Sequence, residues 1–547
     1  MSAKTAFAPD LERPRTADDV AVREPLTEDA PWVIQRGEHK HFRTGEDLAR
    51  LVRLLDGSRD HDQLAAELGS PWTPGHIGRA VRSLADSDLL EDGRPVKKPA
   101  RVRFAGPLTI QFTLVKPERM LRRLAPLVRP LGHRAVLGAA AAVVLLGVLA
   151  LAASGATLGE ALSRPMPLWA YACVMLGVVA TTAVHEMAHG AVLTHHGGTP
   201  SRMGFMLFYM SPAFFCDVSD GWRLPSARQR VQVALAGIAI QAVAAGTAAL
   251  AALAVPAGPA RETLLLVALV NYMVCVVNLL PLVKLDGYLA LMSHLDISHL
   301  REKAMTDARR AIARIVFGGR GYQRELPGRG WSVPYGIACL LFPLYLVSSA
   351  LTLWSGILQR LGIAGSCMMV CALGYLLWRL GKGAVTLVRE AVQAGARPAR
   401  IAAAGVLATA GLALAAALVQ IPATVSAGYT TERDGSLSLL VPRGGGGFDL
   451  TEGTTVTLRR SGLFSRPQTG TATLGEPTGH DVLAPVTAML PVASDRPWLE
   501  MKAYPLHRVT ATPAPDGTDR TGVAEVQAGH HPLWKWFAVS YLGPLLP

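Results

Sequence analysis

The sequence is poor in cysteine and in charge. Only six of its 547 residues are cysteines, all within or beside long apolar stretches, and residues 425–547 contain none. Charged residues make up 17% of the chain, whereas hydrophobic residues make up 50%. Zinc-finger, P-loop and dinucleotide-binding motifs are also absent from the sequence. These absences exclude a disulfide framework in the carboxyl-terminal region and give no support to a nucleotide-binding enzyme.

The apolar residues are concentrated in runs long enough to cross a bilayer, which needs about 20 residues per helix. Such runs occupy residues 135–153, 167–193, 231–253, 263–283, 332–357, 361–379 and 401–421. They predict a mainly α-helical, polytopic membrane protein with about seven transmembrane helices. Residues 1–31 are polar, charged and contain proline, so we expect a flexible tail there rather than a cleavable signal peptide.

Lysine and arginine are concentrated on one side of these spans, because basic loops alternate with loops that have almost no basic residue. The basic clusters lie in residues 116–134, 298–330 and 382–400, whereas the intervening loops near 154–166, 254–262 and 358–360 carry at most one basic residue each. Basic loops stay in the cytoplasm, so we expect a cytoplasmic amino terminus and an extracytoplasmic carboxyl terminus. The net charge of +13 then meets anionic lipid headgroups, and we expect no nucleic-acid partner.

The second apolar run contains a His-Glu-x-x-His motif at His185, Glu186 and His189. Residues four apart share a helix face, so the two imidazoles can bind one metal ion while the glutamate reaches a bound water. Ionisable groups at membrane depth are costly and indicate a functional site. A catalytic zinc takes three protein ligands, and Asp286, at the end of the fourth run, is a carboxylate suited to be the third.

Together, His-Glu-x-x-His and the later Asn-x-x-Pro-x-x-x-Leu-Asp-Gly sequence (residues 278–287) resemble the motifs of the site-2 protease family of intramembrane zinc metalloproteases. The resemblance implies one zinc ion per chain, with His185, His189 and Asp286 as its ligands. It also implies that Glu186 is the general base and that Asn278 positions the substrate.

Four other polar residues near these motifs are alternative ligands. They are His195, His196, Asp217 and Asp220. Because Asp286 already completes a set of three ligands, we expect these residues to have structural roles. Cys367 and Cys371, four apart on one predicted helix, are more typical of apolar packing than of a metal site.

Residues 32–95 predict a separate small domain. A β-hairpin pattern at 32–43 precedes helical patterns at 46–55, 60–68 and 74–87, which together are typical of a winged helix. The segment LLDGSRDHDQLAAELG resembles leader-peptide-recognition domains of pathways that make ribosomally synthesised, modified peptides (RiPPs). A purely stabilising domain or a DNA-binding domain remains an alternative, although its third helix carries only two arginines.

The remaining segments complete the predicted organisation. Residues 96–134 form a linker with a strand and a basic amphipathic interfacial helix, 135–300 the metalloprotease core, and 301–424 a basic cytoplasmic loop with further transmembrane helices. Residues 425–547 predict an extracytoplasmic β-rich domain with an aromatic, interfacial carboxyl terminus. Residues 108–130 of the linker and residues 214–237, which follow a hydrophobic, re-entrant-looking stretch at 203–215, resemble segments of membrane zinc proteases from bacterial peptide-modification gene clusters.

The expected function is therefore cleavage of a peptide precursor by a zinc endopeptidase, at a membrane-embedded site that faces the cytoplasm. The expected partners are the precursor peptide and the lipid bilayer. Two alternatives remain open at this point. One is regulated intramembrane proteolysis of a membrane-anchored regulator, and the other is a peptide export or immunity protein with structural zinc.

Overall fold

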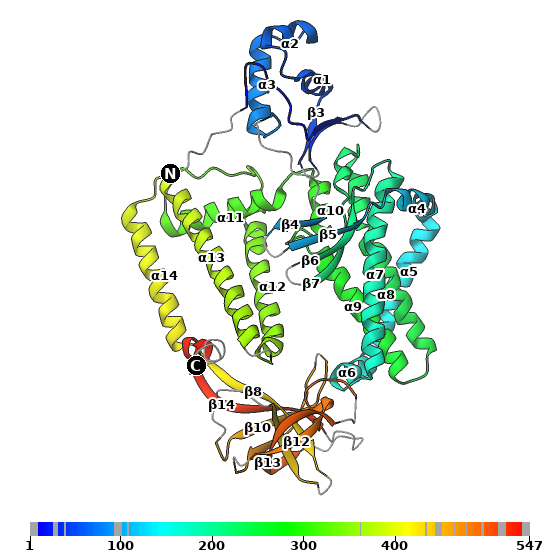
Figure 1. Ribbon diagram of the computed structural model, residues 1–547, viewed down its shortest axis with the longest axis vertical. Helices are drawn as coiled ribbons and strands as arrows, with labels where there is room; N and C mark the ends of the chain where they lie inside the picture. Colours follow the sequence, from blue (N-terminus) through cyan, green and yellow to red (C-terminus); the bar gives the residue numbers. More distant parts are fainter. Residues whose placement is uncertain are drawn as a thin grey trace. The chain divides into compact units, whose positions relative to one another are not determined.

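The computed structural model describes residues 9–25, 31–37, 40–91, 101–106, 109–208, 211–360, 363–432, 435–442, 451–463, 465–476, 479–493, 497–511 and 521–538. The chain divides into two compact units. The first comprises Met1–Leu145, Val178–Gly246 and Asn271–Ser298, and the second comprises Leu146–Gly177, Thr247–Val270 and His299–Pro547. Figure 1 labels the helices and strands of both units.

The prediction of about seven membrane-spanning helices is confirmed. In the described part of the chain, seven helices are long and apolar enough to cross a bilayer. They are α5 (Arg134–Ala153), α7 (Leu168–His195), α8 (Ala227–Ala254), α9 (Pro259–Leu279), α12 (Ser332–Arg360), α13 (Ile363–Gln393) and α14 (Pro398–Leu418). A short helix that the sequence analysis missed, α6 (Gly155–Ser163), connects α5 to α7. The protein is therefore of the multi-pass membrane type.

The amino-terminal domain contains the expected hairpin and three helices. Its elements are β1 (Val20–Arg23), β2 (Trp32–Arg36), β3 (Lys40–Thr44), α1 (Glu46–Leu54), α2 (His61–Leu68) and α3 (Pro74–Asp86). Asp60 caps α2 by accepting the backbone N–H of Gln63, and Thr73 caps α3 just before a proline. The three helices gather beside the small sheet around fully buried Ile34, Leu51 and Ile77. Its assignment as a winged helix stays a prediction.

The expected flexible tail over residues 1–31 differs from the structure. Residues 9–25 are described, and β1 adds a third strand to the hairpin by pairing with β2. Thr16 donates its backbone N–H to the Leu55 carbonyl at 3.0 Å, and Ala17 is buried. The segment is ordered because its backbone groups find partners on the small domain, which a polar composition alone does not reveal.

A four-stranded antiparallel sheet joins two distant parts of the sequence. Its order is β4 (Val102–Gly106), β5 (Thr109–Val115), β6 (Met203–Phe208) and β7 (Ser211–Cys216). The re-entrant-looking stretch is thus a β-hairpin that pairs with the linker. Gly204 permits this pairing, because a Cβ atom there would lie 2.0 Å from the Phe112 carbonyl oxygen. The predicted amphipathic helix α4 (Glu118–Leu131) follows β5 directly.

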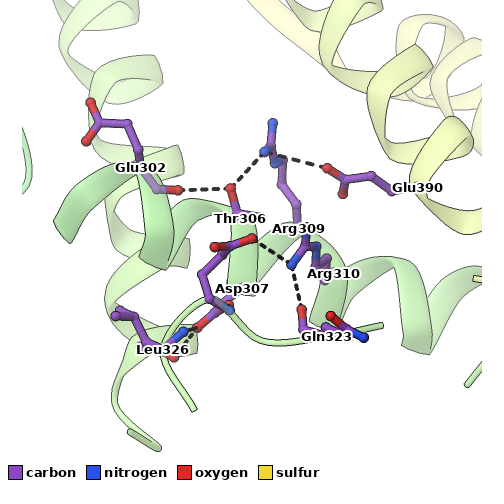
Figure 2. Close-up of polar contacts among 10 residues, drawn as sticks. Glu302, Thr306, Asp307, Arg309, Arg310, Gln323, Leu326 and Glu390 are labelled. Atoms are coloured by element: carbon purple, nitrogen blue, oxygen red, sulfur yellow. Dashed lines mark hydrogen bonds and ion pairs between the residues drawn. The ribbon is translucent and has the colours of Figure 1, made fainter. Parts of the chain in front are cut away.

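The segment expected as a basic loop after residue 298 is largely the helix α11 (Leu300–Phe317). Gly336 on α12 lets the two helices approach closely, because a Cβ atom there would lie 2.0 Å from the Ala304 carbonyl oxygen of α11. Asp307 is 2% exposed and accepts hydrogen bonds from the backbone N–H groups of Glu325 and Leu326 and from Ser332. Figure 2 shows this aspartate among the polar contacts of α11. Asp307 therefore holds the loop after α11 against the helix, because its carboxylate accepts the backbone N–H groups of that loop.

Two arginines of α11 extend this polar network. Arg309 donates a 3.0 Å hydrogen bond to the hydroxyl of Thr306 and lies 3.7 Å from the carboxylate of Glu390 on α13. Arg310 donates to the Gln323 carbonyl at 2.6 Å (Figure 2). Part of the basic charge is therefore used to hold α11 against α13 and the following loop.

The carboxyl-terminal region is β-rich, as expected, and closes into a barrel. Its strands are β8 (Gln420–Thr431), β9 (Leu437–Pro442), β10 (Thr455–Arg459), β11 (Gln468–Leu474), β12 (His480–Pro485), β13 (Pro497–Ala511) and β14 (Thr521–Pro532), with a final helix α15 (Leu533–Phe537). The order β11-β10-β14-β8-β9-β13-β12, with β11 also paired to β13, closes the sheet. Figure 1 shows the strands curling around one another. Residues 539–547, part of the expected interfacial terminus, lie outside the described residues.

The barrel is attached to the start of α7 within the second unit. Met166 donates its N–H to the Pro491 carbonyl at 3.0 Å and accepts the N–H of Ala493 at 2.9 Å. The Tyr171 hydroxyl donates to the same Pro491 carbonyl at 2.5 Å. These hydrogen bonds fix the beginning of the helix that carries the His-Glu-x-x-His motif.

Candidate metal centre

The three expected metal ligands come together in the structure. His185 and His189 lie one turn apart on α7, with ring centroids 4.8 Å apart. Asp286 is the first residue of α10 (Asp286–Leu295), which follows α9 after a short non-helical connection. The nearest ligand atoms of the three side chains all lie within 4.8 Å of one another. Among the described residues, no other group of three such side chains has this arrangement.

The other ring nitrogens of the histidines are held by acceptors. Nδ1 of His189 lies 2.7 Å from the Val233 carbonyl oxygen, and Nδ1 of His185 lies 2.8 Å from Oε1 of Gln241. A carbonyl oxygen can only accept, so each Nδ1 carries the proton and donates it. In the neutral imidazole, Nε2 then carries a lone pair that can bind a metal. This arrangement is typical of metal-binding histidines.

One of the two distances from Asp286 to the imidazoles is the distance expected around a zinc ion, and the other is shorter. Oδ2 of Asp286 lies 2.8 Å from Nε2 of His185 and 3.3 Å from Nε2 of His189. Ligands at about 2.0–2.2 Å from a tetrahedral zinc are separated by roughly 3.3 Å. Nε2 of His189 is buried and lacks a hydrogen bond among the described residues. In its neutral form each imidazole would face this carboxylate with a lone pair, and a cation held among the three side chains would remove that repulsion.

Gly237 on α8 gives the two imidazoles their room. A Cβ atom at this position would lie 2.5 Å from Nε2 of both His185 and His189. Such distances are far shorter than van der Waals contact, and both rings are held by hydrogen bonds on their opposite sides. Only glycine therefore lets α8 pass this close to the Nε2 atoms of the two histidines.

We expect Gly237→Ala to weaken zinc binding by at least about tenfold, because the added methyl group displaces the ligand nitrogens. Zinc content and affinity of the detergent-purified protein measure this effect. Gly138→Ala on α5 is the matched control, since a Cβ atom there meets no heavy atom within 4 Å. Equal zinc affinity in both variants would show that Gly237 does not limit the space of the site.

Glu186 is half-buried and is held by the sheet. Its Oε2 accepts the backbone N–H of Cys216, the last residue of β7, at 2.8 Å. Glu186 follows His185 directly on α7, so it adjoins the helix face that carries His185 and His189 and is not part of the three-residue group. The hydrogen bond fixes one carboxylate oxygen and leaves the other as a potential proton acceptor.

Asn278 lies in the last turn of α9, next to the metal-binding region. A Cβ atom on Gly287 would lie 2.1 Å from the Leu279 carbonyl oxygen, so the end of α9 and the start of α10 are in close contact. Asn278 and Asp286 are the chain neighbours of these two residues. This places the backbone of Asn278 near that of Asp286, and its role in substrate positioning stays a prediction.

A buried polar chain behind His185 was missed by the sequence analysis. Gln241 on α8 donates from Nε2 to Oδ1 of Asn271 on α9 at 3.0 Å, and the Thr181 hydroxyl donates to the same oxygen at 2.6 Å. Gln241 is 1% exposed and Asn271 is fully buried. Burying an amide inside an apolar span is costly unless the amide is hydrogen-bonded. A glutamine or an asparagine within such a span is therefore the sequence signal that could have identified both residues.

The alternative ligands have structural roles in the described structure. Asp217 accepts the hydroxyls of Ser201 and Ser219 at 2.9 and 2.6 Å and pairs with Arg202. Burial alone would raise the pKa of Asp217, but these hydrogen bonds and the arginine hold that pKa below its ordinary value. Asp220 accepts the N–H of Thr199 at 2.8 Å. Both aspartates therefore stabilise the turn between α7 and α8.

The two histidines after the motif lie at the end of α7. The rings of His195 and His196 contact each other with centroids 5.2 Å apart, and Nε2 of His196 lies 3.1 Å from Oε1 of Gln232 on α8. Neither belongs to the three-ligand group. Cys367 and Cys371 are free and exposed on α13.

No known protein was found to be similar to this chain. The chain matches no protein-family model, and the searches among curated proteins and solved structures found no similar protein. Interpretation of the site therefore rests on its own geometry.

Proposed function

We propose that this protein is an intramembrane zinc endopeptidase of the site-2 protease type. The observation that carries the proposal is the convergence of His185 and His189, on the candidate membrane span α7 with Glu186 beside them, with Asp286 at the start of α10. Two imidazoles and one carboxylate match the ligand set of catalytic zinc sites, which leave a further position for water or substrate. We place one zinc ion per chain in this site.

Bound zinc would polarise the scissile carbonyl and acidify a water molecule. Glu186 accepts the proton of the attacking water and returns it to the leaving amine. Its hydrogen bond from Cys216 orients the carboxylate for this transfer. Gln241 and the Val233 carbonyl hold the two imidazoles in the tautomer that binds metal. These groups of the chain thus position the proton acceptor and the metal independently.

The substrate has to reach this site in an extended conformation, because a transmembrane helix satisfies its own amides and hides its peptide bonds. β7 is an edge strand of the four-stranded sheet, and its last residue contacts Glu186. An extended peptide can add to such an edge as another strand. Asn278 lies in the last turn of α9, shortly before Asp286 in the chain, and we assign its amide side chain to substrate positioning.

We assign the substrate to peptide precursors that carry a leader. The amino-terminal domain supports this choice, because its sheet offers edge strands and it contacts the core of the first unit. Arg43 on β3 donates to Asp296 at 3.1 Å and to the Trp222 carbonyl at 3.3 Å, and Arg230 donates to the same Asp296 at 2.7 Å. Asp296 ends the helix that Asp286 begins. A domain that recruits the leader would thereby sit on the element that carries a metal ligand.

Incubation of the reconstituted protein with a leader-bearing precursor encoded beside its gene tests the proposal. Mass spectrometry should find two fragments whose masses add to that of the precursor plus one water. An intact precursor, together with cleavage of a membrane-anchored regulator, would favour regulated intramembrane proteolysis. Zinc binding without any hydrolysis would favour the third alternative, an export or immunity protein.

Deletion of residues 1–95 should raise the precursor concentration needed for half-maximal cleavage by about tenfold or more, because a tethered recruitment domain increases the local substrate concentration. Zinc content should not change, since the ligands lie on α7 and α10. Cleavage rates over a range of precursor concentrations measure the effect. A truncated protein as active as the full chain on dilute precursor would contradict recruitment and favour a sensor role for the domain.

We place the amino-terminal domain and the open side of the metal site in the cytoplasm, and the barrel outside, from the distribution of basic residues. A membrane-impermeant thiol reagent applied to intact cells should label Ser436→Cys but not Ser58→Cys. The unchanged protein, with its six native cysteines, is the background control. The opposite labelling pattern would invert the topology.

A further inference from the structure

The helix α4 has three distinct faces. Leu121 is fully buried against the protein core. At 100° per residue, a second apolar face lies beside this contact and consists of the exposed side chains Met120, Leu127 and Leu131. The rest of the surface carries exposed arginines: Arg122 and Arg129 lie opposite the apolar face, Arg119 lies between these two faces, and Arg123 lies beside Leu127. One face therefore belongs to the protein core, and the other two remain available to the surroundings.

The position of α4 along the chain fixes its surroundings. Only residues 132 and 133 separate it from the membrane-spanning helix α5. The helix must therefore lie near the end of a span, at the level of the lipid headgroups. A helix with an apolar face next to a basic face is suited to this plane, where acyl chains meet anionic headgroups.

The buried face of α4 contacts the catalytic helix directly. A Cβ atom on Gly190 would lie 2.4 Å from Cδ1 of Leu121 and 3.1 Å from Sγ of Cys216. Gly190 is the residue after the metal ligand His189, and Cys216 donates its N–H to Glu186. The interfacial helix, the metal-binding helix and the strand that holds the general base thus meet at one glycine.

We propose that α4 binds anionic phospholipid headgroups and that this binding sets the activity of the metal site through the contact of Leu121 with Gly190. The inference concerns regulation and rests on the proposed protease function. An anionic bilayer is the partner. The helix carries four arginines and only one glutamate, so it is positively charged, and its exposed apolar face can insert among acyl chains. Arg122 is already paired with Glu118, so the other three arginines are the main contacts for the headgroups.

Lipid binding can be measured without any catalytic activity. Full-length protein is reconstituted into nanodiscs of phosphatidylcholine with 30% phosphatidylglycerol, and the retained lipids are identified by native mass spectrometry. The variant Arg119→Gln/Arg123→Gln/Arg129→Gln should lose the preference for phosphatidylglycerol by about fivefold or more. The matched control replaces three exposed arginines of the amino-terminal domain, Arg50, Arg79 and Arg82, by glutamine and should keep it.

Two results would overturn the binding proposal. One is an equal preference for phosphatidylglycerol in the wild type and in the α4 variant. The other is full displacement of the lipid by millimolar inorganic phosphate, which would show a simple anion site rather than a membrane surface.

Coupling to the site is tested by precursor cleavage in nanodiscs with and without phosphatidylglycerol. The wild type should turn over faster in the anionic discs, by about threefold or more, whereas Leu121→Ala should bind the same lipids but lose this difference. Leu121→Met should restore it, since a long apolar side chain again reaches Gly190, and Leu127→Ala on the lipid-facing side should keep it.

Equal wild-type turnover in both discs would refute the coupling. An intact lipid preference without any cleavage in either disc would refute the protease function and leave the lipid surface established.

Discussion

Glu186→Gln should retain one equivalent of zinc and cleave the precursor at least about 100-fold more slowly than the wild type. The expected loss follows from the size of general acid–base contributions, which are typically 10²–10⁴-fold. The amide keeps the shape of the side chain and can still accept the N–H of Cys216 through its oxygen. The glutamine amide has no basic oxygen that can accept a proton from water. The substitution should therefore slow hydrolysis strongly without affecting metal binding. Initial rates by mass spectrometry, together with metal analysis, measure both quantities.

Glu160→Gln is the matched control for this substitution. Glu160 lies on α6, where its carboxylate pairs with Arg164 at 3.2 Å near the surface. The pair is exposed and contributes little to stability, so the control should cleave at the wild-type rate. If Glu186→Gln were as active as this control, Glu186 could not be the proton acceptor, and the proposed chemistry would be wrong.

Zinc should fall from one equivalent per chain to about a tenth or less in His185→Ala, His189→Ala and Asp286→Ala. Each substitution removes one of three ligands, and the two remaining groups cannot hold the ion at the same affinity. Precursor cleavage should disappear in all three variants because the metal is lost. Metal analysis by mass spectrometry after detergent purification and dialysis measures the stoichiometry.

His196→Ala tests whether any histidine at the end of α7 has the same effect. His196 lies beyond the motif and contacts Gln232 rather than the ligand group. The variant should therefore keep its zinc. Unchanged zinc in the three ligand variants, or loss of zinc in His196→Ala, would contradict the assigned site.

The membrane-spanning helices and the ligand set were predictable because they depend on local sequence. Apolar runs near bilayer length mark the spans, and the four-residue spacing of His185 and His189 places both on one face of a helix. Asp286 was also identified, since a third ligand was missing and its motif follows a later span. The structure brings these three side chains together as expected.

Two expectations failed where long-range partners decide the structure. Residues 9–25 differ from a tail because Val20–Arg23 pairs with β2, and the basic segment after residue 298 contains a helix that packs closely on α12. Composition favoured a tail and a loop, since neither segment has a long apolar run. The partners lie elsewhere in the sequence and leave no local signal.

By itself the sequence determined a multi-pass helical protein and the residues that can bind a metal, because span length and helix periodicity are local properties. Only the tertiary structure decided how the site is completed. Gly237, Gln241 and Cys216 come from three other elements, and each acts through a close approach or a hydrogen bond to a residue far away in the chain. Such contacts depend on how helices and strands pack in three dimensions, which spacing along one helix does not encode.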